Sequence, residues 1–255
     1  MTRRLFEHLA EVNIELGETR PIWLGTDFDG TLTHHQNDPA TVELPEAMRT
    51  RLATLAAHPR FAVAVISGRS LDDLMPRVGL KNAAYAGNHG LELAAAGLEW
   101  IDPAAMQSRS ELNRCAVDVA EILRGVPGVR LENKQLSLAI DYRPCPLAQR
   151  ADIVERLDQL ATRFPALRMR HALLGSEVLP RTSSSKGTAA RILNKHQLAV
   201  EGTAIYLGDD VTDEDAFREL ADGITIHVGE RETAARFRLE SAEQVADFFD
   251  WLSQF

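Results

Sequence analysis

Two aspartates separated by one residue, Asp27 and Asp29, follow the short apolar segment 21–24, which has the composition of a buried strand. Because side chains alternate along a strand, both carboxylates are expected to begin on the same side of it. Like charges this close are costly unless a cation neutralises them or one of them takes a proton. The pair therefore predicts a site for a hard cation such as Mg²⁺ at the end of a strand, where open α/β sheets bind their ligands.

Two further segments carry groups that bind phosphate. Ser67 and Gly68 follow the apolar run 61–66 and offer a hydroxyl and a backbone N–H that a ligand can approach closely. Lys186 follows a serine-rich stretch and opens a predicted helix. A helix N-terminus favours anions, and the ammonium group adds a positive charge there.

A fourth segment adds carboxylates. Asp209 and Asp213 come directly after the apolar run 204–207, and we expect them to be metal ligands. Each segment alone has an ordinary alternative: a run of acids or a Ser-Gly pair can cap a helix, a lysine can be solvated, and two aspartates can form a turn. Their combination in one chain favours a single site of phosphoryl transfer.

In that site Asp27 is the predicted nucleophile, and Asp29 is the predicted acid and base, which protonates the leaving oxygen and then activates water. Ser67, Gly68 and Lys186 are expected to hold the phosphoryl oxygens. The expected ligands of Mg²⁺ are Asp27, Asp29 through its backbone carbonyl, Asp209 and Asp213.

The elements that position these residues alternate between strands and helices. Apolar runs predict strands at 21–24, 61–66, 82–86, 204–207 and 223–228. Helical spacing is found at 42–58, 71–78, 185–193, 213–220 and 245–252. This order predicts an α/β fold with a parallel sheet. The rhythm changes between about 100 and 180, where two long helical patterns and four shorter strands predict an inserted second module.

Composition limits the possible partners. The chain has 255 residues, 45% of them hydrophobic, and a formal net charge of 28 − 37 = −9. That charge argues against nucleic acid and anionic membranes as partners, but not against an anionic substrate, because a metal and a few cations can dominate a pocket. Two cysteines, Cys115 and Cys145, and the absence of an apolar leader or a long apolar run predict free thiols and a cytoplasmic location.

In order and spacing, four segments resemble the motifs of the haloacid dehalogenase-like phosphatases. They are Asp-Phe-Asp-Gly-Thr-Leu at 27–32, Ser-Gly-Arg at 67–69, Ser-Lys-Gly at 185–187 and Gly-Asp-Asp-x-x-Asp at 208–213. The segments 86–90, 131–134, 142–143 and 177–180 more narrowly resemble the trehalose-6-phosphate phosphatase family. The resemblance implies a Rossmann-like core at 1–100 and 181–255, with a smaller α/β cap domain at 101–180 that sets substrate specificity. It also implies Mg²⁺-dependent hydrolysis of trehalose 6-phosphate to trehalose and phosphate through an aspartyl phosphate.

The resemblance also assigns substrate contacts residue by residue. In the core these are Thr31, Gly68, Arg69 and His89, and in the cap they are Glu132, Lys134, Arg143 and Glu177. Gln135 and Asp141 stand where the family pattern has glycine and histidine. Because an ionised aspartate cannot donate a hydrogen bond, the alternative substrate is a related phosphorylated glycoside, such as glucosylglycerol phosphate or sucrose phosphate.

Two other interpretations are weaker. A non-enzymatic sensor on a decayed phosphatase fold is disfavoured, because the nucleophile, the acid/base and the lysine are all present. The adjacent His34 and His35 are expected to lie in a solvated loop rather than to form a metal pair. Association with a trehalose-6-phosphate synthase is not inferable from the residues.

Overall fold

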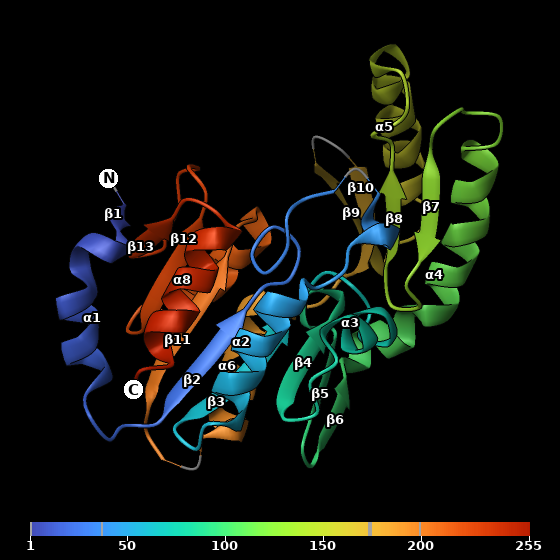
Figure 1. Cartoon of the computed structure of the whole chain (residues 1–255). Helices are drawn as coiled ribbons and strands as arrows, with labels where there is room; N and C mark the ends of the chain where they lie inside the picture. Colours follow the sequence, from blue (N-terminus) through green and yellow to red (C-terminus); the bar gives the residue numbers. More distant parts are fainter. Residues whose placement is uncertain (1, 37, 173–174, 199) are drawn as a thin grey trace. The chain divides into compact units, whose positions relative to one another are not determined.

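The computed structural model divides the chain into two compact units (Figure 1). The described residues are 2–36, 38–172, 175–198 and 200–255. The first unit combines Met1–Trp100 with Ser184–Phe255, and the second is the continuous segment Ile101–Ser183. Two stretches that are far apart in the sequence therefore build the first unit together.

One sheet organises the first unit. Its described strands are β1 (Arg3–Arg4), β2 (Ile22–Thr26), β3 (Phe61–Ile66), β4 (Ala83–Gly87), β5 (Glu92–Ala95), β6 (Leu98–Ile101), β11 (Thr203–Gly208), β12 (Ile224–Val228) and β13 (Phe237–Leu239). They are arranged in the order β1-β13-β12-β11-β2-β3-β4-β5-β6. All pairings from β1 to β4 are parallel, and β5 pairs with β4 in antiparallel orientation. The C-terminal ends of β2, β3, β4 and β11 consequently meet at one edge.

Helices cover both faces of this sheet, because side chains along its central strands alternate between two apolar layers. In β2, Ile22 and Leu24 belong to one buried cluster and Trp23 belongs to the other. The helices of the first layer are α1 (Leu9–Leu16), α2 (Glu46–Ala57), α3 (Leu71–Val78) and α8 (Ala242–Leu252). Those of the second layer are α6 (Lys186–Gln197) and α7 (Glu214–Glu219). Single-turn 3₁₀ helices are η1 (Leu5–His8), η2 (Pro39–Thr41), η3 (Asn88–Gly90) and η4 (Val211–Asp213).

The second unit is a smaller antiparallel sheet backed by two helices. Its strands are β7 (Arg130–Asn133), β8 (Leu138–Asp141), β9 (Leu167–Ala172) and β10 (Gly175–Pro180), in the order β7-β8-β10-β9. The helices are α4 (Pro103–Ile122) and α5 (Leu147–Ala161). Leu112, Leu138, Ile140 and Leu157 lie in one buried cluster, which forms a core separate from that of the first unit.

The predicted α/β class with a mainly parallel central sheet is confirmed, and the antiparallel sheet of the second unit is separate from it. The sequence patterns missed α1 and the short strands β1, β5, β6 and β13. Strands of two to four residues at or near the sheet edges bury few side chains, so they leave no continuous apolar run.

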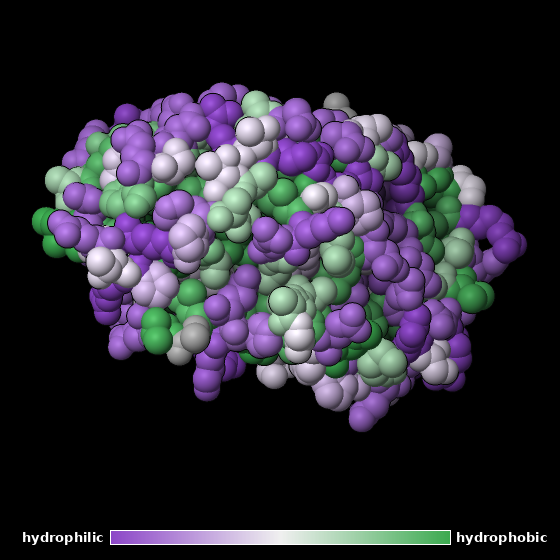
Figure 2. Space-filling model, turned by 60° about the horizontal axis from the view of Figure 1, so that its bottom comes forward, coloured by the Kyte–Doolittle hydropathy of each residue, from purple (hydrophilic) through white to green (hydrophobic). Residues whose placement is uncertain are grey.

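The surface seen in Figure 2 is largely hydrophilic, with hydrophobic side chains in separate groups among the polar ones. Among the described residues, no helix combines the length and the apolar character needed to cross a membrane.

Candidate active site

Three carboxylates meet at the sheet edge where β2 and β11 end. Asp27 directly follows β2, and Asp209 directly follows β11, its parallel neighbour. Asp213 ends η4, the turn that comes next along the chain. One carboxylate oxygen from each residue lies within 4.8 Å of the others. Residues from opposite ends of the sequence thus form one acidic cluster, the group of Asp27, Asp209 and Asp213.

A buried lysine binds two members of the acidic cluster. The Nζ atom of Lys186 lies 2.6 Å from Oδ1 of Asp27 and 2.9 Å from Oδ1 of Asp213. Lys186 is the first residue of α6, which Ser185 caps in a reciprocal arrangement with Thr188. The capping box fixes the start of the helix, and with it the point from which the lysine side chain enters the cluster.

The electrostatics of the cluster are dominated by burial. Burial raises the pKa of Asp27 well above its ordinary value, against the opposing effect of Lys186, and the other two carboxylates raise it further. Burial likewise raises the pKa of Asp213, which also accepts a hydrogen bond of 2.8 Å from the hydroxyl of Tyr206. Burial alone would lower the pKa of Lys186, but its two carboxylate partners raise it above the ordinary value. The lysine is therefore held in its charged form.

The donor set fits a hard metal ion. Lys186 supplies one positive charge to three crowded carboxylates, so it neutralises only part of their charge. Oxygen ligands of this kind are those that Mg²⁺ and similar divalent cations prefer. The acidic cluster could therefore hold a metal ion.

The loop after β2 wraps around Asp209. The hydroxyl of Thr31 donates to Oδ1 of Asp209 at 3.2 Å, and Nε2 of His35 lies 2.8 Å from Oδ2. This hydrogen bond raises the pKa of His35. Gly30 has a φ of +86°, and a Cβ atom there would overlap the carboxylate of Asp209. A glycine is needed at this position both for the backbone conformation and for the close approach. His34 points elsewhere and contacts a carboxylate on α8.

Asp29 lies outside the acidic cluster and has a different partner. Arg69 binds both of its oxygens, with Nε and a terminal nitrogen each 2.7 Å from a carboxylate oxygen. The guanidinium also contacts Asp73 at 2.6 Å and lies 5.4 Å from the centre of the Phe28 ring. Such a planar two-point contact fixes the orientation of the Asp29 carboxylate.

Ser67, Gly68 and His89 lie at the same sheet edge, after β3 and β4. Ser67 is buried; its carbonyl accepts the N–H of His89 at 3.0 Å and its hydroxyl accepts the N–H of Arg69 at 3.2 Å. A Cβ atom on Gly68 would overlap the imidazole of His89. His89 itself has a φ of +59°, in the left-handed region. The two loops are thus packed against each other, with little room for larger residues.

In the second unit, predicted sugar contacts lie in one row across the sheet. Glu132 on β7 is opposite Ala139 on β8, which is opposite Glu177 on β10, which is opposite Arg170 on β9. Residues that pair directly across strands share a face, and this face is not the one that packs on α4 and α5. The small side chain of Ala139 separates the two glutamates. Lys134 directly follows β7.

Two arginines of the second unit are oriented by acids. Nε of Arg170 donates to Glu177 at 3.0 Å. Arg143 binds both oxygens of Asp141, at 2.9 and 2.8 Å. Partial burial would raise the pKa of Asp141, but the hydrogen bonds from Arg143 lower it below the ordinary value. Gln135 has a φ of +68°, in the left-handed region that favours glycine. Glycine is also the residue that the family pattern has at this position.

Sequence reasoning missed several of these partners. In the sequence, Tyr206 is part of an apolar run, His35 lies in a segment expected to be a solvated loop, and Arg170 lies in a predicted strand that carries no motif. Their contacts with Asp213, Asp209 and Glu177 depend on strand order and register, for which the local pattern carries no signal.

Comparison with known families matches this chain to the trehalose-phosphatase family model over residues 25–243. The chain is 38% identical over 245 residues to the trehalose-phosphate phosphatase of Mycobacterium bovis, a match that covers 89% of this chain and 60% of that protein. It is 36% identical over 232 residues to the trehalose-phosphate phosphatase of Mycobacterium marinum, covering 87% and 59%. The chain therefore spans about 60% of the length of the curated relatives it matches.

Solved structures share the fold. The C-terminal domain of Candida albicans trehalose-6-phosphate phosphatase matches with a TM-score of 0.82 at 23% identity, covering 100% of this chain and 99% of that one. The sucrose-phosphatase of Synechocystis matches with a TM-score of 0.54 at 19% identity, covering 91% and 98%. The same architecture is thus found in phosphatases named for different sugars, so the fold alone does not select the substrate.

Proposed function

The chain belongs to the trehalose-phosphatase family, and we propose that it hydrolyses trehalose 6-phosphate to trehalose and inorganic phosphate with Mg²⁺ as cofactor. The observation that carries the proposal is the buried contact of Lys186 with Asp27 and Asp213 at the end of β2. It provides a carboxylate nucleophile, a cation for phosphoryl oxygens and a place for a metal within one cluster.

The first step transfers the phosphoryl group to the protein. A carboxylate oxygen of Asp27 forms a bond to phosphorus while the bond between phosphorus and the sugar oxygen breaks. Asp29 gives its proton to that oxygen, so that the sugar leaves as a neutral alcohol. In the structure, Arg69 donates hydrogen bonds to both carboxylate oxygens of Asp29. One of these bonds must break for Asp29 to carry this proton.

The second step hydrolyses the aspartyl phosphate and regenerates the carboxylate of Asp27. Asp29 takes a proton from water, whose oxygen attacks the phosphorus of the aspartyl phosphate, and inorganic phosphate leaves as Asp27 is restored. Ser67 and the N–H of Gly68 hold the phosphoryl oxygens together with Lys186 in both steps. Asp27, Asp209, Asp213 and the backbone carbonyl of Asp29 would hold Mg²⁺. When bound, the cation would offset the surplus negative charge, keep Asp27 ionised and draw charge from the phosphoryl group.

We assign the second unit, Ile101–Ser183, to recognition of the sugar as a cap domain; the sequence predicted this domain at 101–180. Support comes from the row of Glu132 and Glu177 on one sheet face and from the orientation of Arg143 by Asp141. Carboxylates accept hydrogen bonds from sugar hydroxyls and guanidinium groups donate to them. Arg69, His89, Thr31 and Lys134 complete the proposed substrate contacts.

A substrate panel tests the proposal. Phosphate release would be measured with Mg²⁺ on trehalose 6-phosphate, sucrose 6-phosphate and glucosylglycerol phosphate. We expect the highest kcat/KM for trehalose 6-phosphate. A clear preference for either of the other two would instead support the related-glycoside alternative and assign a selective role to Asp141.

A further inference from the structure

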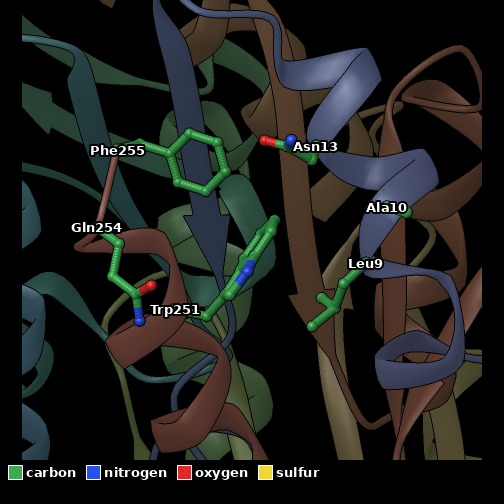
Figure 3. Close-up of a pocket in the computed structure, with 6 residues that line it drawn as sticks. All are labelled: Leu9, Ala10, Asn13, Trp251, Gln254 and Phe255. Atoms are coloured by element: carbon green, nitrogen blue, oxygen red, sulfur yellow. The ribbon is translucent and has the colours of Figure 1, made fainter.

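A pocket in the first unit lies away from the acidic cluster. It has a volume of about 390 Å³ and lies between α1 and the end of α8 (Figure 3). Its lining residues are Leu9, Ala10, Asn13, Trp251, Gln254 and Phe255. This volume is within the range of about 300–1,000 Å³ that is usual for small-molecule sites.

The pocket lies toward the sheet edge where the parallel strands begin. Arg60, the residue before β3, has its guanidinium 5.4 Å from the centre of the Phe255 ring. The same guanidinium donates to the carbonyl of Leu16 at the end of α1, at 2.8 Å. The acidic cluster is at the opposite edge, where these strands end. The pocket is therefore a separate place on the same unit, and the proposed hydrolysis does not use it.

An aromatic surface forms one wall of the pocket and is fixed by its neighbours. The indole of Trp251 is stacked on the buried ring of Phe248, with centroids 5.7 Å apart and an angle of 18° between planes. The ring of Phe255 meets the indole edge-on at 4.8 Å. Because these contacts hold the indole in place, a ligand would lose little entropy in ordering it.

The polar side chains that line the pocket are uncharged. Asn13 and Gln254 contribute carboxamides, which both donate and accept hydrogen bonds, and Asn13 extends from α1 toward the ring of Phe255 in Figure 3. No charged side chain is among the lining residues, although 25% of the chain is charged. A phosphorylated or otherwise ionic ligand would find no partner there among the lining side chains.

We propose that this pocket is a binding site for an uncharged saccharide. The flat C–H face of a pyranose ring suits an aromatic surface such as Trp251, and its hydroxyls suit the carboxamides of Asn13 and Gln254. The apolar side chains of Leu9 and Ala10 would close the other side. A neutral disaccharide is also what the proposed reaction releases, and the choice of trehalose as the probe rests on that proposed function.

The indole N–H signal of Trp251 in a ¹H–¹⁵N NMR spectrum gives a local readout, since the chain has only three tryptophans. The signal is assigned by its loss in Trp251→Phe. Trehalose titrated to about 50 mM, which covers millimolar dissociation constants, should shift this signal but not that of buried Trp23. Mannitol is the matched control, because it has hydroxyls but no ring face, and it should leave the Trp251 signal in place.

Side-chain variants then separate this pocket from the cap. Asn13→Ala should weaken trehalose binding at Trp251 about fivefold, as expected for one hydrogen bond of ~1 kcal/mol. Asn113→Ala, which truncates an exposed asparagine on α4, should have no effect, and neither should Glu177→Ala. No shift of the Trp251 signal, or a shift that Glu177→Ala abolishes and Asn13→Ala preserves, would overturn the proposal. Phosphate release from trehalose 6-phosphate is measured separately, so a protein that hydrolyses it without this shift retains the proposed function and lacks the site.

Discussion

Replacing Lys186 by methionine should leave the carboxylates of the acidic cluster without their positive partner and so destabilise the folded protein. At 2.6 and 2.9 Å, and with an effective dielectric constant of about 20, each contact with Asp27 and Asp213 is worth roughly 6 kcal/mol before desolvation is subtracted. Removing one partner of such a buried pair costs about 3–5 kcal/mol, because the remaining charges are left uncompensated. We expect Lys186→Met to lose that much unfolding free energy at pH 7 without metal.

The stability loss caused by Lys186→Met should depend on pH, in a direction that follows from the pKa shifts of the two carboxylates. Burial already raises the folded-state pKa of Asp27 and Asp213 above the ordinary value of 3.8, and loss of Lys186 raises it further. Between 3.8 and the raised pKa the folded state binds more protons than the unfolded state, so stability falls as pH rises through this window. The penalty of Lys186→Met should therefore be full above the raised pKa and should shrink toward pH 4.

Urea unfolding of the wild type and the variant, at several pH values and with or without Mg²⁺, measures this effect. Mg²⁺ should restore part of the stability of Lys186→Met, because it binds the folded cluster and supplies positive charge. Lys195→Met, which removes an exposed lysine from the same helix, is the control and should change stability little. A loss below about 1 kcal/mol for Lys186→Met, with no dependence on pH, would refute the reasoning.

Four further outcomes are expected. Asp29→Asn should slow hydrolysis by about 10²–10⁴-fold while Mg²⁺ affinity in calorimetry largely survives, because its expected metal contact is a backbone carbonyl. Glu177→Ala should lower kcat/KM for trehalose 6-phosphate by at least about tenfold and leave p-nitrophenyl phosphate unaffected, since that substrate has no sugar; equal losses on both would indicate a structural role. Hydrogen bonds from Arg69 and Arg77 lower the pKa of Asp73 below 3.8 despite its partial burial, so Asp73→Asn should destabilise at pH 7, with the difference vanishing as pH falls through that lowered pKa. Chelation of divalent metal should abolish phosphate release and lower the melting temperature, and Mg²⁺ should restore both.

Much of the first unit could be predicted, because its central strands are buried on both faces. The runs 61–66 and 204–207 are almost entirely apolar, and each is followed at once by polar residues, so both the strand and its end are visible in the sequence. The ends of parallel strands meet at one edge, so Asp27 and Asp209 could be expected together. The short strands β1, β5, β6 and β13, at or near the sheet edges, lack this signal, and the sequence patterns do not predict them.

The partners of the functional groups could not be predicted. Asp27 and Asp29 are two residues apart, and strand alternation predicts a shared environment. Strand β2 ends at Thr26, however, so the alternation does not extend to Asp29, which is bound by Arg69 instead. Which of many arginines reaches which acid depends on register and rotamer, as with Arg170 and Glu177 on neighbouring antiparallel strands. The local sequence pattern specifies neither the register of the strands nor the rotamers of the side chains.

Phosphate release from trehalose 6-phosphate by the wild type and by Asp27→Asn, at saturating Mg²⁺, tests the central claim most directly. The substitution keeps the shape of the side chain but removes the attacking charge. Asp222→Asn, which alters an exposed aspartate after α7, serves as the control. We predict turnover by the wild type and by the control, with a loss of at least about 10³-fold in Asp27→Asn. Turnover by Asp27→Asn above about a tenth of the wild-type value would contradict the assignment of Asp27 as the nucleophile.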